Sequence, residues 1–312
     1  MKIAGHHHLS MLTGNAQRIA DFYRATLGLR MVKKSVNQDD PSMYHLFFGD
    51  KAGSPGTELT FFELAHAAQT RRGSGAISKI SLLVRGKAAL DYWNQRFEAM
   101  DVDHGEYTTY GGRQALPFED PDGLPLQLVD LGEGKTPAFW EEWADSPVPA
   151  EYRILGIGPV EFAVRKPEET ERLLMRLFGF HHAFSNGEER IYQSAEGEAF
   201  GEIVIKRSAS EKERPGRGSV HHLAVRVSDE EELREWDRRI REQGLHTTGV
   251  VDRYYFQSLY FREPNGILVE LATDGPGFAA DESPDALGER LALPPFLKER
   301  RAEIEAKLKP IR

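Results

Sequence analysis

Three side chains in this sequence combine metal-binding residue types with strand positions on a common face. His8, His222 and Glu270 each lie in a short segment in which apolar and polar residues alternate. Side chains alternate between the two faces of a strand. Leu9 therefore faces the helix side of the predicted sheet, while His8 and Ser10 face the other, concave side. An unpaired glutamate in a strand interior would cost several kcal/mol, so we expect a divalent cation to be the shared partner.

A gap-free internal repeat provides a comparison for two of these residues. The segment that holds His222 and Glu270 aligns with an earlier segment in which Lys79 and Gln127 occupy the matching positions. If the fold alone required histidine and glutamate there, the earlier copy should keep them, so the pattern favours function. The alternative is structural, with each side chain in an ordinary hydrogen bond or ion pair. We give that interpretation to the other histidines considered, namely His45, His66, His104, His181, His182 and His246.

Composition limits the chemistry and the partners. The chain has no cysteine, which excludes thiolate nucleophiles, zinc ribbons and iron–sulfur clusters, so a metal must be held by imidazole and carboxylate groups. The net charge is −9 and no basic run occurs, so we expect no nucleic-acid partner. There is also no apolar stretch long enough to span a bilayer and no signal-like start. We therefore expect a cytoplasmic protein without a membrane partner.

The candidate ligands belong to a repeated unit of secondary structure. Each copy opens with a strand, at 77–84 or 220–227, continues in an amphipathic helix, and then has three β-rich stretches. The last two stretches are joined by a Pro-Asp-Gly or Pro-Asn-Gly turn that favours a hairpin. Apolar residues recur at helical spacing in both copies, namely Leu90, Trp93 and Phe97, and Leu233, Trp236 and Ile240. These features predict a βαβββ module.

Two looser copies, at 5–64 and 158–207, bring the number of predicted modules to four and the fold class to α+β. Residues 131–153 contain proline, aromatic and acidic residues and are expected to form a packed linker. We predict three parts. The N-terminal domain, 1–145, holds modules one and two, and the C-terminal domain, 150–275, holds modules three and four. The tail, 276–312, ends in a charged helix that docks on the surface.

The order of these modules resembles the vicinal oxygen chelate superfamily, which includes extradiol ring-cleaving dioxygenases and glyoxalases. The resemblance implies that the four modules pair into two glyoxalase/bleomycin-resistance-like domains. It is closer to the hydroquinone-type ring-cleaving dioxygenases and spans nearly the whole chain. The motifs that carry it are Gly5-His6-His7-His8-Leu9-Ser10, Thr13-Gly14, Phe22-Tyr23, Leu27-Gly28, Tyr44-His45-Leu46, Val220-His221-His222 and Val269-Glu270.

This resemblance implies an oxidoreductase that opens hydroquinones or related dihydroxybenzenes with O2. It implies that His8, His222 and Glu270 bind Fe(II), or Mn(II) as in some members. Two histidines and one carboxylate on one side of a metal leave coordination positions open for substrate and O2. Catechol dioxygenases of the wider superfamily usually take all three ligands from the C-terminal modules. Here Glu161 or a neighbour occupies the first strand of module three, so His8 must complete the set from module one.

The resemblance also assigns roles around the metal. It implies that Tyr260 and His221 act as proton donors, and that Arg253 steadies a phenolate or a ring-opened carboxylate. His7 matches a residue close to the ligands in the hydroquinone enzymes, and Ser10 shares the ligand face and could hydrogen-bond the substrate. Strand alternation places His7 and His221 on the face opposite the ligands. A position at the end of the sheet, near the pocket mouth, would reconcile the two.

Two other classes of function remain open. A glyoxalase-like isomerase or lyase would need a fourth ligand on the last strand of module one. Our alignment places Thr60 there, with Glu58 or Glu63 as substitutes if the register differs. A non-catalytic binding protein for small molecules would need no metal set at all. The sequence does not decide between catechol and hydroquinone, between metals, or whether the chain forms a homo-oligomer.

Overall fold

The computed structural model describes all residues, 1–312, and consists of four βαβββ modules and a tail. Module one comprises β1 (His6–Thr13), α1 (Ala16–Asp21) with a π-helical turn (Phe22–Thr26), β2 (Arg30–Val36), β3 (Tyr44–Gly49) and β4 (Glu58–Glu63). Module two comprises β5 (Ala76–Val84), α2 (Gly86–Ala99), β6 (Thr108–Tyr110), β7 (Arg113–Glu119) and β8 (Pro125–Asp130).

Modules three and four repeat this order of elements. Module three comprises β9 (Gly156–Val164), α3 (Pro167–Arg172) with a π-helical turn (Leu173–Leu177), β10 (His181–Ser185), β11 (Glu189–Gln193) and β12 (Glu202–Arg207). Module four comprises β13 (Ser219–Val227), α4 (Glu230–Glu242), β14 (Thr247–Asp252), β15 (Phe256–Arg262) and β16 (Leu268–Pro276). The predicted α+β class and module count are confirmed, and no helix is long and apolar enough to cross a membrane.

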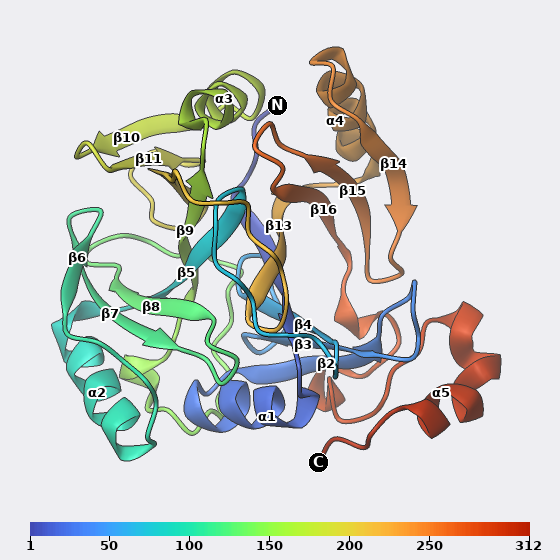
Figure 1. Cartoon of the computed structure of the whole chain (residues 1–312). Coiled ribbons are helices and arrows are strands. Elements are labelled where there is room, and N and C mark those ends of the chain that lie inside the picture. Colours follow the sequence, from blue (N-terminus) through green and yellow to red (C-terminus); the bar gives the residue numbers. More distant parts are fainter.

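The modules pair differently from their order in the chain. One eight-stranded sheet has the order β14-β15-β16-β13-β1-β4-β3-β2 and so joins modules four and one. The other has the order β10-β11-β12-β9-β5-β8-β7-β6 and joins modules three and two. Figure 1 shows β1 beside β13 and β5 beside β9 near the centre, with helices α1 to α4 at the periphery. The predicted segments 1–145 and 150–275 each contribute half of both sheets, because the antiparallel partner of each first strand lies in the other segment.

Strand alternation sorts the first strands as the sequence indicates. Leu9 and Met11 on β1, and Leu223 and Val225 on β13, are fully buried in the main apolar core. The apolar residues predicted on the two longer helices are also fully buried, namely Leu90, Trp93, Phe97, Leu233, Trp236 and Ile240. Burial of each Leu, Ile or Phe contributes roughly 1.5–3 kcal/mol. Because this face of each sheet packs against the helices, the side chains on the other face point toward the concave side.

The linker between modules two and three packs against both sheets. Trp140 donates its indole N–H to the carbonyl oxygen of Pro55 at 2.9 Å. Its ring lies against Gly56 and Gly156, where a Cβ atom would come within 2.8 Å and 2.5 Å of the indole, respectively. Glycine at these two positions therefore lets the indole reach the backbone of both sheets, in agreement with a packed linker.

The tail is anchored through a buried lysine. Lys33 on β2 is fully buried, and its ammonium donates to the carbonyl oxygen of Phe278 at 3.0 Å and to Asp281 at 2.7 Å. It also pairs with Glu282 and lies 4.6 Å from the centroid of the Tyr255 ring. The final helix, α5 (Arg301–Lys307), buries only Ile304 and so docks on the surface.

Removal of the Lys33 ammonium should destabilise the fold, because it leaves two largely buried carboxylates without a cation. We expect Lys33→Ala to lower the free energy of unfolding by about 3–5 kcal/mol. The control is Lys51→Ala, which removes an ion pair with Glu141 that is half exposed on both sides and should cost at most about 1 kcal/mol. Urea denaturation measures both, and equal losses would contradict this assignment.

Candidate metal centre and its cavity

Three neighbouring strands bring His8, His222 and Glu270 together. His8 lies on β1, His222 on β13 and Glu270 on β16, which are adjacent in the sheet. The Nε2 atoms of the two histidines lie 3.3 Å apart. Glu270 Oε2 lies 3.3 Å from His8 Nε2 and 2.8 Å from His222 Nε2. All three side chains are buried. His8 lies more than 200 residues before the other two in the chain, yet all three converge on one point.

Hydrogen bonds behind His8 define which of its nitrogens is free. His7 Nε2 lies 3.2 Å from the carbonyl oxygen of Thr273, which can only accept, so this nitrogen of His7 carries the proton. Burial, followed by the charge of His8, lowers the pKa of His7 to about 3, so its ring is neutral and its Nδ1 is an acceptor. His8 must then donate from Nδ1 to His7 Nδ1, at 3.0 Å. Its Nε2 is then the nitrogen available to a metal, and it lies on the side of Glu270.

The second histidine has the same arrangement. His222 Nδ1 lies 2.8 Å from His221 Nδ1. Burial, followed by the charge of His222, lowers the pKa of His221 to about 4, so this ring is also neutral at physiological pH. If His222 binds a metal through Nε2, its Nδ1 donates to His221, and His221 then carries its proton on Nε2. Each ligand histidine is thus oriented by the histidine that precedes it in the sequence.

β-Bulges explain how His7 and His221 reach these positions. In the antiparallel pair of β1 and β13, Cα partners skip from His6 to His8 on one strand and from His222 to Val220 on the other. The extra residue of a bulge is unpaired and breaks the alternation of faces. The bulges therefore account for both histidines lying beside the ligand rings. His221 is exposed, as a place near the pocket mouth implies, whereas His7 is buried. Both flank the ligands from within the strands, and His221 lines the cavity, whereas His7 does not.

The donor set fits a divalent cation. Glu270 Oε1 accepts a hydrogen bond from the Ser258 hydroxyl at 2.5 Å, whereas the buried Oε2 atom faces the Nε2 atoms of His8 and His222. Burial alone would raise the pKa of Glu270, but the facing His8 and His222 lower it well below its usual value. Positive charge between Glu270 Oε2 and the two Nε2 atoms therefore stabilises this cluster, and a divalent cation can supply that charge when both Nε2 atoms are unprotonated. The residues present therefore suit a metal bound by two histidines and one carboxylate.

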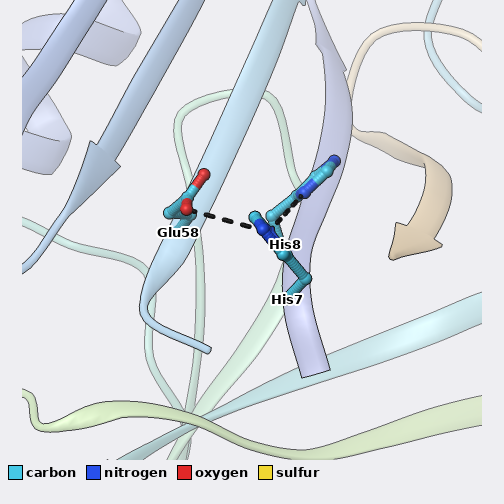
Figure 2. Close-up of side chains that lie close together, drawn as sticks. All are labelled: His7, His8 and Glu58. Carbon is cyan, nitrogen blue, oxygen red and sulfur yellow. Dashed lines mark hydrogen bonds and ion pairs between the residues drawn. The ribbon is translucent and has the colours of Figure 1, made fainter. Parts of the chain in front are cut away.

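Glu58 lies behind this set. It pairs with His8 across β1 and β4, and its Oε1 is 3.7 Å from His7 Nδ1 (Figure 2). Burial raises the pKa of Glu58 well above its usual value, which favours the neutral carboxyl group. Ser10 lies two residues after His8 and pairs with Thr60. In module four, Ala224 lies two residues after His222 and pairs with Glu270. Thr60 therefore occupies the fourth-ligand position expected for an isomerase, as the sequence alignment predicted.

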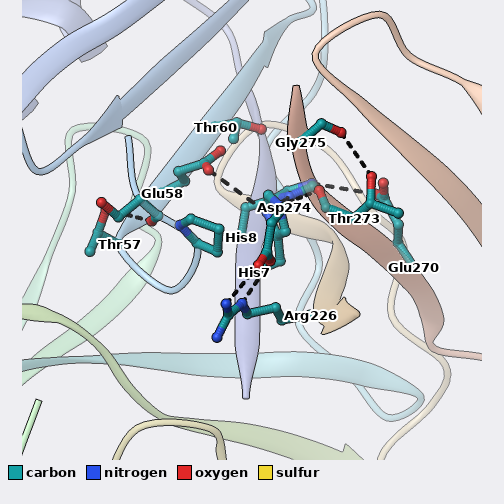
Figure 3. A network of polar contacts seen from close by, with 12 residues as sticks. His7, His8, Thr57, Glu58, Thr60, Arg226, Glu270, Thr273, Asp274 and Gly275 are labelled. Carbon is teal, nitrogen blue, oxygen red and sulfur yellow. Dashed lines mark hydrogen bonds and ion pairs between the residues drawn. The ribbon is translucent and has the colours of Figure 1, made fainter. Parts of the chain in front are cut away.

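Figure 3 shows the polar contacts that continue from His7 and His8 into module four. Arg226 on β13 forms a bidentate ion pair with Asp274, with both N–O distances at 2.6 Å. This pair lies next to Thr273, whose carbonyl oxygen holds His7. The strand end that orients His7 is thus fixed by a separate ion pair.

A cavity of about 500 Å³ opens over the three candidate ligands. This volume lies in the range of small-molecule sites. The remaining predicted residues Ser10, His221, Arg253 and Tyr260 line it, whereas the predicted substrate contact His7 lies behind His8. Much of the wall is apolar, formed by Leu12, Val36, Met43, Phe47, Phe62, Leu64, Phe256 and Leu268.

Tyr260 and Arg253 form one polar side of this cavity. Tyr260 is the cross-strand partner of Glu270, and its ring centroid lies 5.7 Å from that of His222. The Arg253 guanidinium lies 5.5 Å from the Tyr260 ring centroid and forms an ion pair with Asp39 at 3.0 Å. Burial, followed by the charge of Glu270, raises the pKa of Tyr260 above its usual value, so the phenol keeps its proton at neutral pH.

His45, for which the sequence favoured a structural role, lines the cavity. On β3, Leu46 and Phe48 are fully buried in the core, so His45 and Phe47 face the other way. The same alternation that identified His8 would have found His45. Its Nε2 hydrogen-bonds Thr60 Oγ1 at 3.0 Å, and Thr60 Oγ1 hydrogen-bonds Ser10 Oγ at 2.8 Å.

The second sheet has the same module design without this convergence. Glu161 accepts from the Ser78 hydroxyl at 2.7 Å and from Tyr110 at 3.3 Å. Gln127 donates to the Ser81 hydroxyl at 2.8 Å, and the Lys79 ammonium lies 5.2 Å from the Tyr110 ring centroid. Polar groups here satisfy one another, as expected of a structural face.

Comparison with known proteins agrees with this architecture. Residues 5–128 and 156–271 match the model of the glyoxalase/bleomycin resistance protein/dioxygenase superfamily. The chain belongs to this superfamily. It is 50% identical to MhqA of Bacillus subtilis, which is named a ring-cleaving dioxygenase, over all of both chains. It is 32% identical to chlorohydroquinone/hydroquinone 1,2-dioxygenase of Sphingobium indicum, covering 95% of this chain and 93% of that one.

Solved structures with the same fold include proteins of this superfamily. A Bacillus subtilis protein described as a dioxygenase has a TM-score of 0.93 and 37% identity, covering 100% of this chain and 98% of that one. Glyoxalase I from Zea mays has a TM-score of 0.63 and 14% identity, covering 86% and 92%, respectively. The second match concerns the fold alone.

Loss of any one candidate ligand should abolish metal binding. We expect His8→Ala, His222→Ala and Glu270→Ala to retain little metal after anaerobic loading with Fe(II), because each removes a convergent donor. Lys79→Ala and Gln127→Ala are matched controls at the repeat positions of the other sheet and should load fully. Metal analysis by mass spectrometry, with circular dichroism as a check on folding, measures this. Full metal content in the three ligand variants would refute the assignment.

His7 should act on the metal through His8. In His7→Phe the Nδ1–H of His8 loses its acceptor, so we expect metal affinity to fall about 10- to 100-fold while the thermal transition shifts little. His182→Phe, at an exposed histidine on β10, is the control and should bind metal normally. Unchanged metal affinity in the His7 variant would show that His8 does not need this partner.

Proposed function

We propose that this protein is an Fe(II)-dependent ring-cleaving dioxygenase that opens para-hydroquinones with O2, with Mn(II) as the alternative metal. The observation that carries the proposal is the convergence of His8, His222 and Glu270, whose donor atoms all lie within 4.8 Å of one another, beneath a partly apolar cavity. The names of the two enzyme relatives, a ring-cleaving dioxygenase and a hydroquinone 1,2-dioxygenase, support the same reaction class. Bound in this set, Fe(II) would supply open coordination positions at which substrate and O2 meet.

The protein's own groups supply orientation and proton transfer. The Arg253 guanidinium next to Tyr260 provides positive charge that stabilises a phenolate or the carboxylate of a ring-opened product. Tyr260 keeps its proton and lies next to His222, so it can donate to an oxygen held near the ligands. His221 lines the cavity and can donate from Nε2 when its Nδ1 accepts from His222. The apolar wall holds the aromatic ring and limits the access of water.

Two other functions are less well supported. An isomerase of the glyoxalase type would use a fourth carboxylate or amide ligand, but Thr60 occupies that position and Glu58 does not line the cavity. Glu63 instead accepts the backbone N–H of Ala16 at the start of α1. A metal-free binding protein would have no use for three convergent donors. Metal analysis of protein purified without added metal separates the three, since we expect iron rather than zinc, nickel or none.

The substrate preference is directly testable. A catechol offers two adjacent oxygens to a metal, whereas a hydroquinone offers one and depends more on nearby hydrogen bonds for orientation. We expect faster oxygen uptake with methylhydroquinone than with methylcatechol in the Fe(II)-loaded enzyme. Faster cleavage of the catechol would contradict the proposal.

Tyr260→Phe should lower turnover more than iron content, because it removes a proton donor and no ligand. The variant keeps the ring that packs beside His222 and Arg253, so the cavity wall should persist. Oxygen uptake and iron content measured on the same preparation provide the comparison. Unchanged hydroquinone turnover in the variant would exclude Tyr260 as the donor.

A further inference from the structure

His45 is held rigidly between two aromatic rings. The centroid of its imidazole lies 4.0 Å from that of Phe47 and 4.0 Å from that of Phe62, with interplanar angles of 38° and 31°. Phe47 in turn contacts Phe278 of the tail, with centroids 5.0 Å apart. A side chain packed in this way loses little further conformational entropy when it binds a ligand, which favours affinity.

Only one ring nitrogen of His45 is used inside the protein. Nε2 hydrogen-bonds Thr60, whose hydroxyl is itself bound to Ser10. Nδ1 forms no hydrogen bond with the protein, yet it is not among the buried polar atoms without a partner. Because His45 lines the cavity, this accessible Nδ1 is the nitrogen that a substrate there could reach.

The position of His45 in the sheet places it across the metal centre from Tyr260. The strand order β15-β16-β13-β1-β4-β3 puts Tyr260 at one end, His45 at the other, and the three candidate ligands between them. Neighbouring strands lie about 4.8 Å apart, so β3 is roughly 10 Å from the His8 strand. Tyr260 is therefore suited to the end of a substrate at the metal, and His45 to an atom farther into the cavity.

On the basis of the proposed function, we propose that His45 Nδ1 hydrogen-bonds the hydroxyl group of a para-hydroquinone that is not bound to the metal. The substrate ring then spans from the metal to β3 along the apolar wall. The Thr60 hydroxyl, itself bound to Ser10, holds Nε2 of His45 and so fixes the plane of the imidazole, which leaves Nδ1 free for the substrate. A phenol without the second hydroxyl has nothing to offer this nitrogen, so His45 would select para-dihydroxy rings.

Binding without turnover tests this assignment. The dissociation constants of hydroquinone and 4-methylphenol are measured anaerobically with the Fe(II)-loaded protein and with His45→Phe, which keeps a ring between Phe47 and Phe62. Loss of one neutral hydrogen bond should weaken hydroquinone binding about three- to tenfold and leave 4-methylphenol binding unchanged. His45→Gln, which keeps polar atoms, should retain part of the preference, and His182→Phe should behave as the unmodified protein.

The possible results separate the two proposals. Equal weakening of both ligands would reveal a purely structural role for His45, and unchanged hydroquinone binding, or no preference for hydroquinone in the unmodified protein, would also overturn the assignment. Failure of the proposed function has a different signature, namely no oxygen uptake with any dihydroxybenzene by the iron-loaded protein while the binding preference persists.

Discussion

The antiparallel pairing of β1 with β13 is the interaction on which the site depends. It joins the first strand of the chain to the first strand of module four, pairs His8 with Ala224 and Ser10 with His222, and so brings the Nε2 atoms of His8 and His222 within 3.3 Å. The parallel pairing of β13 with β16 then adds Glu270 from the next strand. Two bulges in the same β1–β13 pair turn His7 and His221 toward the ligand rings that they orient. The strand pairing that joins modules one and four therefore also assembles the site.

The two sheets show what this pairing alone does not determine. Both are built from the same module, and β5 pairs with β9 as β1 pairs with β13. On one concave face the polar atoms satisfy one another around Glu161. On the other, the Nε2 atoms of His8 and His222 converge on Glu270 Oε2 at 3.3 Å and 2.8 Å. The distinction lies in a few side chains, which is how a duplicated fold can keep one face structural and devote the other to chemistry.

The sequence was sufficient for the elements and for the candidate ligands, because alternation along a strand is a local rule. Leu9 and Leu223 identify the core face, and His8 and His222 follow from them. Pairing between modules is a long-range property that no local pattern encodes, so the predicted domain boundary does not separate the two sheets. Alternation alone places His7 and His221 on the face opposite the ligands, because a bulge breaks the alternation. Only the family resemblance indicated that both lie beside the ligands.

His45 and the tail show two further limits. The sequence favoured a structural role for His45. The burial of Leu46 and Phe48 on β3 implies, by the same alternation rule, that His45 faces the concave side. No local sequence pattern predicts that Lys33 binds Asp281 and Glu282 of the tail, because these residues lie about 250 positions further along the chain.

Anomalous diffraction from crystals loaded anaerobically with Fe(II) can show whether one metal ion binds between His8, His222 and Glu270. We expect one strong anomalous peak within coordination distance of both Nε2 atoms and of Glu270 Oε2. A peak at His7 and Glu58, a peak on the concave face around Lys79 and Glu161, or no peak at all would contradict it.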